Sequence, residues 1–134
     1  MRTIRDYQFI ADEDRGAVAA IGNFDGVHLG HQAALNLVRK IAKESGSQIG
    51  TLTFEPHPRE YFAPKSKAFR LMSAEAKANR LEKLGVERLY QLNFNAALSA
   101  LSAREFAQDV IHKALGLTHV IVGADFCFGK DRAG

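Results

Sequence analysis

Two histidines in the stretch GNFDGVHLGH, residues 22–31, are the side chains of this sequence best suited to chemistry. His28 and His31 stand three positions apart among three glycines. An imidazole exchanges a proton near neutral pH, and an imidazolium stabilises the negative charge that accumulates on a phosphate as its bond to a leaving group lengthens. Phosphoryl-type transfer needs mainly positioning and charge neutralisation. Two imidazoles that face one pocket therefore predict a phosphate site.

The elements around this stretch are expected to place it where α/β proteins bind ligands. The apolar run at 17–22 closes on glycine and predicts a central parallel strand, and the spacing of apolar residues at 31–46 predicts a helix. Ligands of open α/β sheets bind beyond the carboxyl ends of the strands. A helix that begins near Gly30 or His31 directs its unpaired N–H groups and the positive end of its dipole to the same place. Since Gly26 and Gly30 have no Cβ, a phosphate can approach the backbone closely.

Alternating patterns continue along the rest of the chain. Three further strands are predicted, at 49–54, 88–94 and 118–123. Helices are predicted at 73–85 and directly after the capping box of Ser102 and Glu105. The segment 55–69 holds all three prolines and predicts an irregular loop. This alternation predicts the α/β class, with an open parallel sheet that has helices on both faces.

Composition limits the class of protein and of partner. The chain has 134 residues, 46% hydrophobic and 25% charged, which predicts one globular domain with a real core. The net charge of +3 suits a phosphate-bearing ligand. No run of five basic residues and no aromatic stacking motif is present, so we expect small-molecule substrates and no nucleic acid.

The sequence also predicts where the protein works. No apolar stretch approaches the roughly 20 residues of a membrane span, and the first 16 residues lack the apolar core of a signal peptide. The single cysteine, Cys127, excludes an internal disulfide and fits a reducing compartment. We therefore expect a cytoplasmic protein without membrane contact.

The histidine pair has two other interpretations. His28, His31 and Cys127 could in principle meet at a zinc ion, but zinc takes four ligands, or three and a water, and no other residues have paired-ligand spacing. The stretch could also be a glycine turn with incidental histidines. The order of strand, GxFDGxHxGH and helix favours the phosphate site over both alternatives.

The histidine-bearing stretch and two later segments resemble a known family. GNFDGVHLGH is similar to the HxGH signature of the nucleotidyltransferase superfamily, which includes pantetheine-phosphate adenylyltransferases and cytidylyltransferases. Together with TFEPHPRE (53–60) and GADFCFGKDRAG (123–134), it resembles the FMN adenylyltransferase module of bacterial bifunctional FAD synthetases. The resemblance implies a Rossmann-like nucleotidyltransferase fold. It also implies transfer of the AMP moiety of ATP to FMN, with release of FAD and pyrophosphate.

The resemblance also implies roles for individual residues. His28 and His31 would contact the ATP phosphates and stabilise the transition state, with the FMN phosphate as nucleophile. Mg²⁺ is implied because the departing pyrophosphate carries concentrated charge, and its protein ligands are unknown. The implied nucleotide-binding residues are Asn23, Phe24, Asp25, Gly26, Gly30 and Asp125. The implied flavin-side residues are Phe54, Pro56, His57, Pro58 and Phe62, where the prolines would hold a rigid surface for a flat ring.

Family members continue with another strand, a second signature and a riboflavin kinase domain. We therefore expect residues 1–134 to form an incomplete FMN adenylyltransferase domain that lacks the last strand and the kinase domain. Two functional alternatives stay open. One is a domain that binds ATP or flavin without turnover, and the other is a sister nucleotidyltransferase with a different phosphorylated acceptor, against which the FEPHP block argues.

Overall fold

A single parallel sheet organises the chain. The computed structural model describes residues 1–22, 24, 29–55 and 73–122. Within these residues the strands are β1 (Arg2–Ile4), β2 (Val18–Ile21), β3 (Ile49–Phe54), β4 (Arg88–Leu92) and β5 (His119–Val122). They lie in the order β1-β4-β3-β2-β5, and every neighbouring pair is parallel. All carboxyl ends therefore lie at one edge of the sheet.

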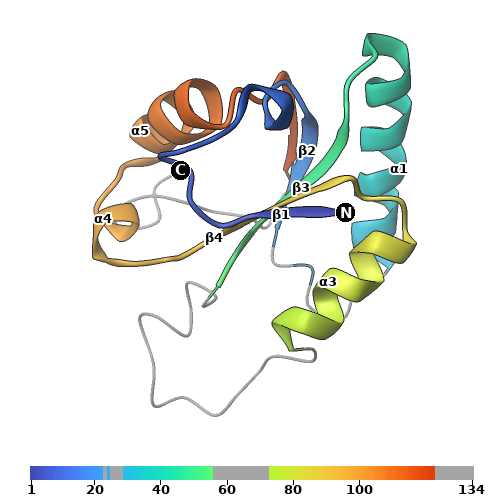
Figure 1. The fold of residues 1–134 in the computed structure, drawn as a ribbon, viewed down its shortest axis with the longest axis horizontal. Coiled ribbons are helices and arrows are strands. Elements are labelled where there is room, and N and C mark those ends of the chain that lie inside the picture. The colour runs from blue at the N-terminus through green and yellow to red at the C-terminus, as the bar shows by residue number, and fades with distance from the viewer. Residues whose placement is uncertain (23, 25–28, 56–72, 123–134) are drawn as a thin grey trace.

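Helices cover both faces of this sheet (Figure 1). The helical elements are η1 (Asp12–Asp14), α1 (Leu29–Ser45), α3 (Ala74–Lys83), α4 (Ala96–Ser99), α5 (Ala103–Glu105) and η2 (Phe106–Ala114). Helices α1 and α3 pack on one face, while α4, α5 and η2 pack on the other. η2 continues α5 with wider turns, in which the N–H of Leu115 donates to the carbonyl of Val110. No described helix is both long and apolar enough to cross a membrane.

Alternation along the central strands divides the core into two layers. All four residues of β2 are buried, so this strand needs apolar cover on both sides. Val18 and Ala20 face α1 and α3, where they pack with Leu35 and Leu81. Ala19 and Ile21 of β2 face the other layer, which includes Phe106. Both layers are apolar, and each holds one group of helices against the sheet.

Most of the predicted fold is confirmed. The structure has the predicted α/β class and the parallel sheet between two helical layers. Each predicted strand and helix is present, with ends shifted by no more than two residues. The prediction missed β1, η1 and α4, because segments of three or four residues are too short to show a hydrophobic period. The predicted loop at 55–69 lies, after Glu55, outside the described residues, and the expected further strand beyond residue 134 stays a prediction.

A buried carboxylate joins the N-terminal elements to the sheet. Asp14 in η1 is 3% exposed, and its carboxylate accepts a hydrogen bond of 2.7 Å from Nε of Arg88. Arg2 of β1 forms an ion pair with the same carboxylate at 3.2 Å. The Tyr90 hydroxyl donates to the Asp14 carbonyl at 2.6 Å. A buried carboxylate costs free energy unless it is paired in this way, and the pairing fixes η1 and β1 to β4.

We expect Tyr90→Phe to lower the free energy of unfolding at pH 7 by about 1–3 kcal/mol, because the buried Asp14 carbonyl loses its donor. Burial, and after it the Asp14 charge, raises the pKa of Tyr90 from 10.0 to about 12. Because the pKa of Tyr90 is raised in the folded state, the neutral hydroxyl contributes to the free energy of unfolding. This contribution is complete below pH 10 and is lost as the pH rises to 12. Urea unfolding across this range should therefore show a steeper loss of stability for the wild type than for Tyr90→Phe.

Tyr7→Phe is the matched control, since Tyr7 is only partly buried. This substitution should change the free energy of unfolding by less than about 0.5 kcal/mol. Equal effects of the two substitutions would contradict the special role of the Tyr90 hydroxyl.

Candidate active site

The candidate site begins where the chain leaves β2. The N–H of Gly22 still donates to the Leu52 carbonyl of β3 at 3.1 Å, so the ladder between β2 and β3 continues through this residue. Phe24 follows with φ of 58°, a left-handed conformation that is rare for a residue with a side chain. The Phe24 ring folds back over the strand end, where a Cβ on Gly22 would lie 3.4 Å from it, in van der Waals contact.

The buried Phe24 ring stabilises the conformation of this turn. It is 1% exposed and belongs to the apolar layer beneath α1 and α3. A left-handed residue other than glycine costs about 1–3 kcal/mol. Burial of a phenylalanine side chain contributes about 1.5–3 kcal/mol, so the buried ring offsets the strain of its backbone.

His31 lies against this ring at the start of α1. The centroids of the Phe24 and His31 rings are 4.8 Å apart, with an interplanar angle of 40°. α1 begins at Leu29, so His31 and Gly30 both lie in its first turn. The helix therefore begins close to the predicted position, and its first turn follows the carboxyl end of the central strand β2. This place favours an anion.

Other predicted site residues divide into two groups. Phe54 is 2% exposed and lies in the layer on the opposite side of the sheet from Phe24. The centroid of its ring lies 5.7 Å from that of Phe94, in an edge-on arrangement, and 5.9 Å from that of Phe106, with the rings tilted. These contacts stabilise the end of β3 within that layer. Contact between Phe54 and a flavin stays a prediction. The remaining predicted residues lie outside the described residues: Asn23, Asp25, Gly26, His28, Pro56, His57, Pro58, Phe62 and Asp125.

The sequence analysis missed a charged pair at the same edge of the sheet. Lys77 of α3 is 3% exposed, and its Nζ lies 3.9 Å from Oε2 of Glu55, the residue after β3. In the sequence Lys77 resembles an ordinary surface lysine. Its position four residues before the buried Leu81 was the available signal, because residues at i and i+4 share one face of a helix.

The described residues were also compared with the zinc alternative of the sequence analysis, which needs His28, His31 and Cys127. Among the described residues, no group of three or more His, Cys, Asp or Glu side chains could hold a metal ion. His28 and Cys127, which the zinc alternative needs, lie outside this part of the chain. The zinc alternative therefore stays untested.

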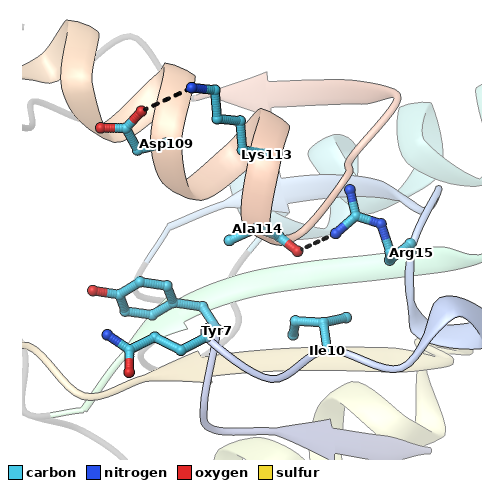
Figure 2. A pocket seen from close by; sticks show the side chains of 7 residues that line it. Tyr7, Ile10, Arg15, Asp109, Lys113 and Ala114 are labelled. Carbon is cyan, nitrogen blue, oxygen red and sulfur yellow. Dashed lines mark hydrogen bonds and ion pairs between the residues drawn. The ribbon is translucent and has the colours of Figure 1, made fainter.

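A cavity of about 450 Å³ lies away from this site (Figure 2). It opens between η2 and the segment 7–10, and its lining includes Arg15 and Lys113. Two of its lining residues, Arg15 and Ala114, come before the amino ends of β2 and β5. The Arg15 guanidinium donates to the Ala114 carbonyl at 2.6 Å, and Lys113 is paired with Asp109 at 4.0 Å.

Comparison with known proteins identifies the family. A family model described as FAD synthetase matches residues 10–134. The chain belongs to the FAD synthetase family. The resemblance seen in the three sequence motifs is thereby confirmed, and the family match includes the β2–Phe24–α1 arrangement.

Relatives in this family carry a two-part name. The chain is 45% identical over 134 residues to a bifunctional riboflavin kinase/FMN adenylyltransferase from Pseudomonas fluorescens, and the match covers 100% of this chain and 43% of that protein. The protein of the same name from Bacillus subtilis (strain 168) is 37% identical, with 97% and 42% covered. The one from Escherichia coli (strain K12) is 36% identical, with 89% and 38% covered. This FAD synthetase domain thus spans less than half the length of these curated relatives.

A solved structure has the same fold. The crystal structure of a protein named macrolide-efflux protein, from Streptococcus pneumoniae, superposes with a TM-score of 0.79 at 28% identity. The match covers 97% of this chain and 43% of that one.

Phe24→Ala should lower the free energy of unfolding by about 3–5 kcal/mol, because the ring leaves a cavity beneath α1 while the backbone strain remains. Phe9→Ala is the control, since Phe9 is 82% exposed and its loss should cost less than about 0.5 kcal/mol. Urea unfolding of both variants measures the difference. A Phe24→Ala cost as small as that of Phe9→Ala would show that the ring does not hold the turn.

Proposed function

We propose that this domain transfers the AMP moiety of ATP to FMN, giving FAD and pyrophosphate. The observation that carries the proposal is the start of α1, which lies at the carboxyl end of β2 with the His31 imidazole packed on Phe24. The family match supports the choice of substrates. Relatives are named for two activities, and the family model that spans residues 10–134 is the one for FAD synthetase.

The proposed step needs little covalent help from the protein. A phosphate oxygen of FMN attacks the α-phosphorus of ATP, and the bond from that phosphorus to the pyrophosphate oxygen breaks. The FMN phosphate is already ionised, so the step requires no strong general base. The electron pair leaves with pyrophosphate, where negative charge accumulates. The N–H groups at the start of α1, with His31 and the predicted partner His28, would stabilise that charge.

Magnesium is part of the proposal, since a divalent cation neutralises the charge of a departing pyrophosphate. Magnesium in proteins commonly keeps several waters and uses one or two carboxylates together with substrate phosphates. The described part of the chain offers no cluster of three ligand side chains. On this general behaviour of magnesium, we expect the substrate phosphates to supply most of the ligands.

We also propose that the reaction occurs in the cytoplasm, on the evidence of a single cysteine and hence no internal disulfide. The partners of the proposed reaction are two small molecules, ATP and FMN. A riboflavin kinase activity belongs to the name of the relatives and is not proposed for residues 1–134.

His31→Ala and His28→Ala should each lower kcat for FAD formation by about 10²–10³, because each removes a group that stabilises charge in the transition state. The assay follows FAD by chromatography after incubation of the chain with ATP, FMN and MgCl₂. His112→Ala is the matched control, since His112 is exposed on η2 and should leave kcat unchanged.

Three other outcomes would change the proposal. Wild-type turnover in both histidine variants would exclude the catalytic assignment. Calorimetric binding of ATP or FMN by the wild-type chain without any FAD would favour a binding-only domain. Turnover with another phosphorylated acceptor, and none with FMN, would favour a sister nucleotidyltransferase.

Removal of divalent cations should abolish FAD formation, because the pyrophosphate would depart with its charge unneutralised. Excess EDTA should stop the reaction, and MgCl₂ added beyond the EDTA should restore it. The far-ultraviolet circular dichroism spectrum should stay the same throughout, since the role proposed for the ion is in the reaction and not in folding. Full activity in EDTA would remove magnesium from the proposal.

A further inference from the structure

Lys77 is buried where a lysine is costly. Its side chain is 4% exposed, and a buried ammonium is unfavourable unless an anion pairs with it. It is also the fourth residue of α3, and its own N–H donates to the carbonyl of the N-cap residue Ser73 at 3.0 Å. The positive end of the helix dipole disfavours a cation at this place. An apolar side chain would avoid both costs, so the charge of Lys77 calls for a role.

Its partner Glu55 is fixed to the end of the sheet. The N–H of Glu55 donates to the Leu92 carbonyl of β4 at 2.9 Å, so the ladder between β3 and β4 continues through this residue. The carboxylate is 24% exposed and lies 3.9 Å from the Lys77 ammonium. Because α3 supplies this partner, the carboxylate belongs to the same side of the sheet as Phe24.

Geometry places this carboxylate near the candidate phosphate site. Strands lie about 4.8 Å apart and advance about 3.3 Å per residue, which puts Glu55 about 8 Å from the point where the chain leaves β2 at Gly22. Charges at this distance still interact at physiological ionic strength. An unneutralised carboxylate here would repel a triphosphate or an FMN phosphate.

Thr53 shows that the same side of β3 is polar as it approaches this edge. It is 0% exposed, and its Oγ1 has no hydrogen-bond partner among the described residues. A valine of similar shape would avoid that cost. Polar and charged side chains therefore replace apolar ones along β3 as the strand nears the candidate site.

We infer that Lys77 is a positioning residue that neutralises and holds Glu55, so that the carboxyl end of β3 accepts phosphate-bearing ligands. The inference deepens the proposed function and rests on it for the identity of the ligands. It concerns binding of anions and includes no chemical step.

Calorimetry with four probes tests this inference. ATP and FMN carry phosphate, whereas adenosine and riboflavin do not. Lys77→Met should raise the Kd of ATP and FMN by at least about threefold, since it removes the positive charge that lies 3.9 Å from the Glu55 carboxylate. The Kd of adenosine and riboflavin should stay within experimental error. The increase in the Kd of ATP and FMN that Lys77→Met causes should become smaller as NaCl is raised from 50 mM to 500 mM, because salt screens the repulsion.

Matched variants separate charge from structure. Lys77→Met/Glu55→Gln removes both charges and should restore the Kd of ATP and FMN, and Lys77→Arg should keep them at the wild-type value. Lys83→Met removes an exposed lysine from the same helix and should leave the Kd values of all four probes unchanged. Lys77→Gln keeps a hydrogen-bond donor beside Glu55, so it replaces Lys77→Met if that variant does not fold.

Equal weakening of phosphorylated and unphosphorylated probes would overturn the inference, because it would show a purely structural role. No rescue by the double variant would overturn it as well, and so would a wild-type chain that binds neither ATP nor FMN. Binding of both with no FAD formed would instead contradict the proposed function and leave the inference supported. The two failures are therefore distinguishable.

Discussion

Burial of β2 on both sides is the constraint on which the rest of this structure depends. A strand whose four residues are all buried must have an apolar layer above and below it. Helical crossovers supply both layers, and they return each strand in the same direction, which makes the sheet parallel. All strands then end at one edge. Because the elements that follow β2 and β3 begin at that edge, His31 and Glu55 reach the same side of the molecule.

Local strain at this edge is held by packing below it. Phe24 adopts a backbone conformation that few side chains tolerate, and its buried ring stabilises it there. The same ring contacts His31, so the apolar layer that holds α1 on the sheet also orients an imidazole at the start of that helix. Fold stability and site geometry are thus coupled through one aromatic side chain. The FAD synthetase family match spans this arrangement.

Buried charges serve different purposes at the two ends of the sheet. At the amino ends, Asp14 is held by two arginines and by a hydrogen bond from Tyr90 to its carbonyl, and the result is a firm attachment of β1 and η1. At the carboxyl ends, Lys77 and Glu55 are separated by 3.9 Å, longer than a hydrogen bond. The tight network suits a structural role. The pair of Lys77 and Glu55 lies where ligands of α/β proteins bind, which suits the control of charge that we infer for it.

By itself the sequence determined the α/β class and four of the five strands seen in the described residues, because these follow from local periodicity. It also determined the start of α1 within two residues, because glycines and histidines in one motif mark that position. It also determined the family, through GNFDGVHLGH and the two blocks after it. Only the tertiary structure decided the strand order, the stacking of Phe24 on His31 and the burial of Lys77 beside Glu55. Each of these depends on which distant residues meet, and short-range patterns carry no information about a partner that another element supplies.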